Sequence, residues 1–181
     1  MREIPSIETG RLRLRGGRED DFETYDAIFR DPEVARFIAK LPSPTEAWRS
    51  MAAVAGHWAL RGYGPWAVER KSDGALIGRI GFWYPAGWPA LELIWAVAAS
   101  EWGKGYASEG GRAAMDYGFE HLRLPQVTSH IDPENFRSQA VARRLGQRPG
   151  ETVDISIGQE RFPVVAWEIS RQELSKSRIP A

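Results

Sequence analysis

The chain has 181 residues, of which 43% are hydrophobic, so we expect one domain with a sizeable core. Its 24 basic and 24 acidic side chains cancel, which argues against a nucleic-acid partner. The absence of cysteine excludes disulfides, thiolate metal sites and a covalent cysteine intermediate. No apolar run approaches the roughly 20 residues of a membrane span. We therefore expect a cytoplasmic protein that does not insert into membranes.

The first third of the chain predicts one strand and three helical segments. Leucines alternate with arginines over 11–15, as in a strand with one solvent-facing side. Acidic residues at 19–21 lead into a helix through Phe29, and Pro32 then starts a short helical turn. The segment Ser43-Pro44-Thr45-Glu46 is typical of a helix start, and Gly62 is placed to end that helix.

The middle of the chain predicts a β-hairpin. Strands are expected over 65–70 and 76–84, on either side of the turn Ser72-Asp73-Gly74. Gly78 and Gly81 interrupt the second strand, which indicates a bulge or the close approach of another backbone.

The stretch 91–122 is the most informative part of the sequence. An apolar strand, 91–97, is followed by a glycine-containing turn, 102–107, and then by apolar residues at helical spacing up to Leu122. The start of such a helix directs unpaired N–H groups and the positive end of its dipole at one place beyond the strand. We therefore predict that this loop holds a pyrophosphate.

The remaining segments complete a mixed fold. A strand is expected over 127–131, a helix over 135–145, and a hairpin from 153–157 and 162–169 that turns at 158–160. This order predicts an α+β fold in α/β/α layers, with a mostly antiparallel sheet and one parallel crossover around the central helix. We expect a single domain over 1–181, with its core at about 7–170 and a C-terminal tail over 171–181.

Three segments resemble the Gcn5-related N-acetyltransferase (GNAT) superfamily. Residues 102–107 match its coenzyme A signature, Gln/Arg-x-x-Gly-x-Gly/Ala, except that Trp102 replaces the first residue. Residues 135–146 resemble the Asn-x-x-Ser-x-x-Val-x-x-Lys/Arg-Leu-Gly segment of the branch that acetylates ribosomal-protein N-termini (RimJ/RimL-like). Residues 8–15 also resemble the start of that branch.

The resemblance implies a fold in which two central strands splay apart to admit the cofactor. It implies acetyl transfer from acetyl-coenzyme A (acetyl-CoA) to a primary amine by direct attack in a ternary complex, without a metal. The acceptor is then either a protein N-terminus or a small amine, such as an antibiotic, a polyamine or an amino-acid derivative. A catalytically idle acyl-CoA-binding module is the alternative.

The resemblance also implies where the cofactor binds. Backbone N–H groups of 103–107 and the Ser108 hydroxyl would hold the pyrophosphate, while 96–99 would pair with pantetheine, unless this is an ordinary strand end. The Val97 N–H is the candidate donor to the thioester oxygen, and Asn135 would bond the pantetheine amides or cap its helix. The expected cofactor-binding residues are Ala96, Val97, Ala98, Ala99, Trp102, Gly103, Lys104, Gly105, Tyr106, Ala107, Ser108 and Asn135.

Two residues are the catalytic candidates. Glu92 is the single charge in an apolar strand, so it is either a buried general base with a raised pKa or a residue on the solvent side. Many relatives protonate the departing thiolate with a tyrosine at the position of Ala142. Ser138 is the substitute that the resemblance suggests, although a thiol with a pKa of roughly 8.5 can also leave unaided.

The remaining expectations concern the acceptor and the assembly. Trp83 and Trp88 either belong to the core or form an aromatic wall for the acceptor. His57, His121 and His130 lack partners at metal-ligand spacing, so we expect structural roles for them and no metal site. Because dimers are the commonest oligomers, we expect a homodimer.

Overall fold

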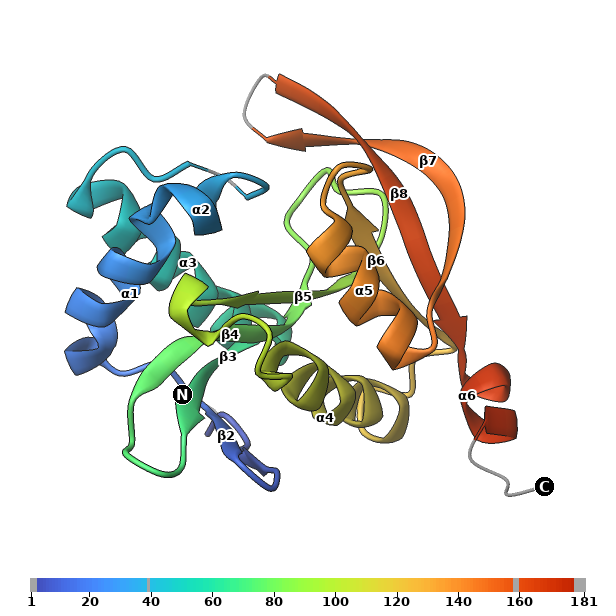
Figure 1. Ribbon diagram of the computed structural model, residues 1–181, viewed down its shortest axis with the longest axis horizontal. Coiled ribbons are helices and arrows are strands. Elements are labelled where there is room, and N and C mark those ends of the chain that lie inside the picture. The colour runs from blue at the N-terminus through green and yellow to red at the C-terminus, as the bar shows by residue number, and fades with distance from the viewer. Residues whose placement is uncertain (1–2, 39, 158–159, 178–181) are drawn as a thin grey trace.

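The computed structural model describes residues 3–38, 40–157 and 160–177. Within these ranges, the strands form one sheet in the order β1-β2-β3-β4-β5-β6-β8-β7 (Figure 1). Neighbouring strands are antiparallel except β5 and β6, which are parallel. The strands are β1 (Ile7–Glu8), β2 (Leu12–Arg15), β3 (Pro65–Arg70), β4 (Leu76–Trp83), β5 (Glu92–Val97), β6 (Gln126–Ile131), β7 (Arg148–Ile157) and β8 (Glu160–Ser170).

Helices cover both faces of the sheet. Helices α1 and α3 pack on one face, and α4 and α5 pack on the other (Figure 1). The expected α+β fold in three layers is therefore confirmed. The helices are α1 (Phe22–Arg30), α2 (Pro32–Ala35), α3 (Pro44–Arg61), α4 (Tyr106–Glu120), α5 (Phe136–Leu145) and α6 (Arg171–Ser177), with 3-10 turns η1 (Glu19–Asp21) and η2 (Ala99–Glu101).

Alternation along β4 separates the two halves of the core. Ile80 and Phe82 are fully buried and point at α4, where Gly110 and Gly118 leave room for them. A Cβ atom added to Gly118 would lie 2.3 Å from Phe82 Cζ. The central helix therefore approaches the sheet more closely than a helix with side chains at these positions could.

The glycines of β4 have the role expected from the sequence. A Cβ atom on Gly78 would lie 2.2 Å from the carbonyl oxygen of Ala96, and one on Gly81 would lie 2.6 Å from that of Gly64. The β3–β4 register also shifts between Val68 and Glu69, as at a bulge. Backbone approach and a bulge thus occur together.

The structure differs from the expected elements at three places. The short strand β1 pairs with β2 and was not expected. Strand β7 begins at Arg148 rather than at 153, because a register shift between Pro149 and Thr152 lets the strand pass the turn-favouring pair Pro149-Gly150. Residues 171–177, expected as part of a tail, form α6, and Leu174 is buried in the core. Residues 158 and 159 of the expected turn lie outside the described ranges.

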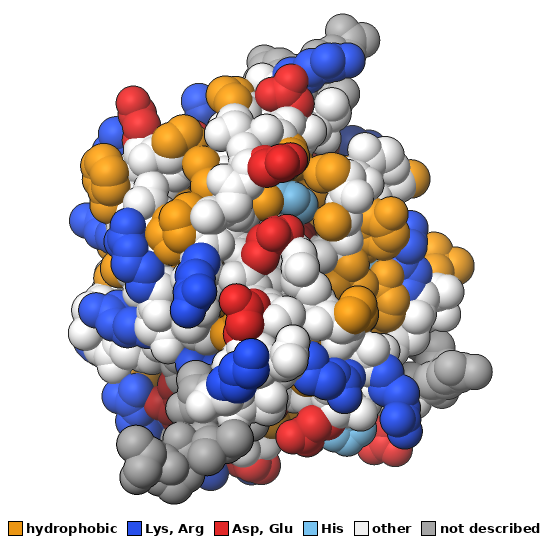
Figure 2. Space-filling model, turned by 90° about the vertical axis from the view of Figure 1, so that its right-hand side faces the viewer, with side chains coloured by type: hydrophobic (Ala, Val, Ile, Leu, Met, Phe, Trp, Pro, Cys, Tyr) orange, Lys and Arg blue, Asp and Glu red, His pale blue; other side chains and the backbone are white. Residues whose placement is uncertain are grey.

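The surface and the helices bear on two classes of partner. None of the helices in the described ranges combines the length and the apolar character that a membrane crossing needs. On the face shown in Figure 2, acidic side chains form a column that separates the Lys and Arg side chains on the left from those on the right and below. No basic stripe therefore crosses the whole of this face, as it would at a nucleic-acid site.

Candidate active site

A cavity of about 1020 Å³ opens at the carboxyl end of β5. The 102–108 loop, the start of α5 and the α2 segment surround it. This volume is at the upper end of the range typical of ligand sites. The residues expected from the sequence that line it are Ala96, Val97, Trp102, Gly103, Lys104, Gly105, Tyr106, Ala107, Ser108, Asn135 and Ser138.

The cavity begins where β5 and β6 separate. The two strands pair at Glu92 and Thr128, and within the described ranges no further pair joins them toward the cavity. Side chains hold the strands together near this point. The Ser129 hydroxyl donates to the Leu93 carbonyl oxygen at 2.8 Å, and the buried Gln147 amide donates to the Ser129 hydroxyl at 3.1 Å. The predicted splayed strand pair is thus present.

The glycine loop has the backbone shape of an anion site. Gly103 and Gly105 adopt left-handed conformations, with φ of 76° and 84°. The first backbone hydrogen bond of α4 runs from the Glu109 N–H to the Gly105 carbonyl oxygen, so the N–H groups of 106–108 have no partner in the helix. They face the cavity together with the positive end of the helix dipole. The loop can therefore bind a pyrophosphate.

Thr9 and Arg11, near the start of the chain, hold this loop in place through Glu109. The sequence patterns did not predict this contact. The Glu109 carboxylate accepts hydrogen bonds from the Thr9 hydroxyl at 2.6 Å and from the Arg11 N–H at 2.8 Å. The Arg11 guanidinium contacts Glu109 at 2.7 Å, donates to the Lys104 carbonyl oxygen at 3.0 Å and lies over the Tyr106 ring. Burial acts to raise the pKa of Glu109, but the hydrogen bonds from Thr9 and Arg11 outweigh it and lower that pKa. The one indication in the sequence was that residues 8–15, which include Thr9 and Arg11, resemble the start of the RimJ/RimL-like branch.

The last residues of β5 present their backbone alternately to the two neighbouring strands. The Ala98 N–H bonds the Ile77 carbonyl oxygen on the β4 side at 2.9 Å. By alternation, the Val97 N–H points away from β4, toward the cavity. Ala96 and Val97 line the cavity, whereas Ala98 and Ala99 lie outside its wall.

Trp102 stands where the coenzyme A signature has Gln or Arg, and its side chain makes a different contact. Its indole N–H donates to the Val97 carbonyl oxygen at 3.0 Å, and the Arg137 guanidinium of α5 lies 4.3 Å from its ring. Trp102 and Arg137 thus connect the glycine loop, the end of β5 and the start of α5.

Two polar residues of α5 meet at the cavity. The Asn135 side chain accepts the Ser138 N–H at 3.1 Å and so caps the helix, as one of its two expected roles requires. The Ser138 hydroxyl accepts the Trp95 indole N–H at 3.3 Å. Ser138 is therefore oriented by a β5 side chain.

Comparisons with known proteins agree with this geometry. Residues 11–148 match the family described as Acetyltransferase (GNAT) domain. The chain belongs to the GNAT acetyltransferase family. It is an acetyl-CoA-dependent N-acetyltransferase.

Similar proteins are known from several bacteria. YkkB of Bacillus subtilis is 31% identical over 158 residues, which covers 81% of this chain and 87% of YkkB. An acetyltransferase from Agrobacterium tumefaciens has a TM-score of 0.81 at 27% identity, covering 93% of this chain and 96% of its own. RimJ of Mycobacterium smegmatis, solved in complex with CoA-disulfide, has a TM-score of 0.73 at 19% identity, covering 90% of this chain and 83% of its own.

In this GNAT acetyltransferase, Glu92 is buried at the point where the strands separate. Its carboxylate accepts the His130 N–H at 3.1 Å, and His130 Nδ1 lies at the same distance. Burial raises the pKa of Glu92, although the contacts with His130 oppose the shift. Glu92 is 4% exposed and does not line the cavity. The side chain therefore points into the protein, not to solvent.

The two tryptophans considered for an acceptor wall lie elsewhere in the acetyltransferase. Trp83 stacks on His57 at 4.8 Å between ring centroids, and Trp88 packs against His130 at 6.4 Å. Neither lines the cavity. The aromatic side chains in its wall are Phe37, Trp95, Trp102, Tyr106 and Phe136.

The histidines of the acetyltransferase form no metal site in the described ranges, which contain no group of three or more potential ligand side chains. His57 is fixed between the Tyr63 carbonyl oxygen at 2.8 Å and the Tyr84 N–H at 3.0 Å. His57 thus has a structural role.

Proposed function

We propose that this acetyltransferase moves the acetyl group of acetyl-CoA directly to a primary amine held in the same cavity. The observation that supports the proposal is that two parts of the chain line one cavity. They are the glycine loop, 102–108, and a segment between residues 33 and 38 that includes the end of α2. A thioester and an amine can therefore meet there without an enzyme-bound intermediate. The absence of cysteine also excludes a cysteine acyl-enzyme.

The residues divide into four roles in this proposal. N–H groups of 103–108 hold the pyrophosphate, and Ala96 and Val97 border the pantetheine arm together with Asn135. The Val97 N–H, which points toward the cavity, donates to the oxygen that becomes negative as the amine attacks the carbonyl carbon. The carbon–sulfur bond then breaks, Ser138 donates a proton to the departing thiolate, and solvent returns a proton to Ser138, which balances the proton that the amine loses.

Glu92 is our candidate for removing the proton that the amine loses. Its pKa is raised by burial, which suits a general base. Because Glu92 lies behind the cavity wall, the proton would have to reach it through an intervening group. His130 contacts Glu92 directly, but its side chain is 2% exposed and does not line the cavity either. We therefore propose that water relays the proton from the amine to the Glu92–His130 pair.

The acceptor that we favour is a protein N-terminus. The RimJ/RimL-like segment 135–146 supports this. The RimJ neighbour, at 19% identity, shares the fold and does not decide the acceptor. A small amine is the second candidate, and a non-catalytic acyl-CoA-binding module is the third.

Thiol release from acetyl-CoA separates these candidates. The panel is a peptide with a free N-terminal Ser or Ala, the same peptide blocked at its N-terminus, a polyamine, an aminoglycoside and an amino-acid amide. We expect amine-dependent thiol release with the free peptide and none with the blocked one. Release with only a small amine would favour the second candidate, and CoA binding without release would favour the third.

A homodimer remains part of the proposal. Light scattering of the purified chain tests it, with a monomer mass as the contradicting result.

A further inference from the structure

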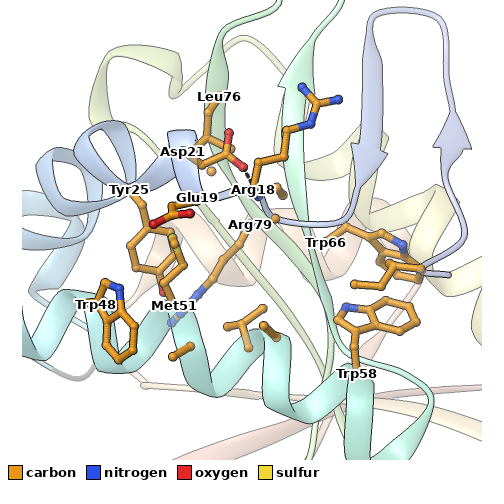
Figure 3. Close-up of a pocket in the computed structure, with 17 residues that line it drawn as sticks. Arg18, Glu19, Asp21, Tyr25, Trp48, Met51, Trp58, Trp66, Leu76 and Arg79 are labelled. Carbon is orange, nitrogen blue, oxygen red and sulfur yellow. Dashed lines mark hydrogen bonds between the residues drawn. The ribbon is translucent and has the colours of Figure 1, made fainter. Parts of the chain in front are cut away.

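A second cavity of about 400 Å³ lies between the sheet and helices α1 and α3, on the face opposite to α4 and α5 (Figure 3). It opens between η1 and α3, and its floor is formed by β3 and β4. Aromatic and apolar side chains dominate the wall: Tyr25, Trp48, Met51, Trp58, Trp66 and Leu76. It shares no lining residue with the cavity of about 1020 Å³ that we propose for acetyl-CoA, called the cofactor cavity below. The volume suits a small ligand with an apolar body.

Arg79 extends from β4 into this cavity without a carboxylate partner. Its Nη1 donates to the hydroxyl groups of Tyr25 and Ser50, and its guanidinium lies 4.5 Å from the Phe29 ring centroid. Its Nε is buried and has no hydrogen-bond partner. Among the described residues, no acidic side chain forms an ion pair with Arg79.

Arg15, a buried arginine on β2, shows the contrast. Arg15 contacts Asp21 at 2.7 Å and Glu69 at 2.6 Å. Leaving a guanidinium within an apolar wall without a counter-ion is unfavourable, because the charge loses water without gaining an opposite charge, and neutral hydroxyl groups compensate only in part. Arg79 therefore suits an anion supplied by a ligand.

The other charged groups of the cavity do not satisfy Arg79. Both carboxylate oxygens of Asp21 accept from Arg15, and one also accepts the Arg18 N–H. In Figure 3 the Arg18 side chain points away from the cavity, and Glu19 lies near Tyr25, on the η1 side. The interior of the cavity is thus cationic at Arg79, with the Glu19 carboxylate at the η1 side.

We infer that this cavity binds a small monocarboxylate with an aromatic or branched aliphatic body. The carboxylate pairs with Arg79, and the apolar body lies against Trp48 and Met51. The ligand is separate from the acetyl donor, because different residues of one apolar cluster line the two cavities: Tyr25 lines the second cavity, whereas Val34 and the adjoining Ala96 line the first. The inference therefore goes beyond the proposed acetyl transfer.

Calorimetry with three matched probes tests the charge requirement. The probes are 3-phenylpropanoate, its neutral amide and 3-phenylpropylamine, titrated into the full chain without acetyl-CoA. We expect the carboxylate to bind at least about tenfold more tightly than the amide, a difference of about 1.4 kcal/mol, and the amine to bind most weakly. Equal affinities for the carboxylate and the amide would overturn the inference, as would no saturable binding of the carboxylate up to about 10 mM.

Variants test the location. Arg79→Gln should remove the preference for the carboxylate, and Glu19→Gln should tighten carboxylate binding about two- to threefold by removing a like charge. Ala52→Phe places a ring in the cavity and leaves Arg79 unchanged, so it reports on the site even if Arg79→Gln does not fold. Carboxylate binding that survives Ala52→Phe would contradict this site. Acetyl-CoA at saturation should leave the probe affinity unchanged, and competition between them would show that the two sites are not separate.

Discussion

Replacing Gly103 by alanine separates the role of the glycine loop in folding from its role in binding CoA. Gly103 has φ of 76°, and a Cβ atom added there would meet nothing within 4 Å. Gly74, in the β3–β4 turn, is a matched control, because it has φ of 73° and equally open surroundings. Both residues are exposed. The two substitutions therefore impose the same backbone strain, but only Gly103 borders the cofactor cavity.

The expected stability loss is small and equal for the two variants. A left-handed alanine costs roughly 1–2 kcal/mol, and the loss of glycine entropy in the unfolded chain returns about 0.4–1 kcal/mol. The net cost of about 1 kcal/mol corresponds to a fall in Tm of roughly 2–4 °C for a chain of this size. Thermal melts of both variants without CoA measure this.

The variants should differ in their affinity for CoA. In Gly103→Ala, the methyl group stands where a phosphate must approach the backbone, so we expect calorimetry to show at least about a tenfold higher Kd, or 1.4 kcal/mol. Gly74→Ala should bind CoA like the unchanged protein. If both variants bind CoA equally well while their Tm values fall equally, the loop does not hold the pyrophosphate.

Three further predictions concern the proposed acid and base and the packing of α4. Burial raises the pKa of Glu92, so its contribution to stability is present below the ordinary carboxyl pKa and is lost as the pH rises through the raised value. Glu92→Gln should therefore gain stability relative to the unchanged protein as the pH rises above the ordinary carboxyl pKa of about 4.3 in thermal melts, and its turnover should fall most where Glu92 is ionised while the amine is still largely protonated, because only an ionised carboxylate can accept a proton. A flat stability difference would contradict the raised pKa, and unchanged turnover would exclude Glu92 as the base. Ser138→Ala should lower kcat by about 10²-fold with little change in KM, and the loss should shrink above a pH of roughly 8.5, where the thiolate leaves unaided; an unchanged kcat at neutral pH would remove Ser138 from the mechanism. Gly118→Ala places a methyl group 2.3 Å from Phe82 Cζ and should lower stability by roughly 1–3 kcal/mol in denaturant titrations, whereas Gly56→Ala, with nothing within 4 Å, should gain up to about 1 kcal/mol; equal effects would contradict the packing.

Local patterns predicted the elements well because their causes are local. The hairpin turn, the cap at Ser43 and the helix after Gly105 depend on neighbouring residues and on hydrophobic spacing. The errors fell where local signals conflict with pairing. Pro149-Gly150 reads as a break, yet β8 is long enough to pair with a bulged β7 on both sides of it.

The site residues were predictable only where a motif is continuous in sequence. The loop 102–108 and the helix that begins after Asn135 were found, and both line the cavity. The sequence did not predict the contact between Arg11 and Glu109, because these residues are 98 positions apart and no spacing rule connects them. The sequence left open whether Glu92 faces solvent, and only the tertiary structure, in which His130 on β6 contacts its carboxylate, shows that it is buried.

The amino-acid order alone determined the layered α+β architecture, the family and the position of the glycine loop that we propose for pyrophosphate, because each rests on periodicity or on a short contiguous motif. Only the tertiary structure decided which side chains surround each cavity. It placed Trp83 and Trp88 outside the cofactor cavity and Arg79 in a second one without a counter-ion. Alternation gives a side chain one of two faces, but what it meets there depends on segments that are distant in sequence and adjacent only after folding.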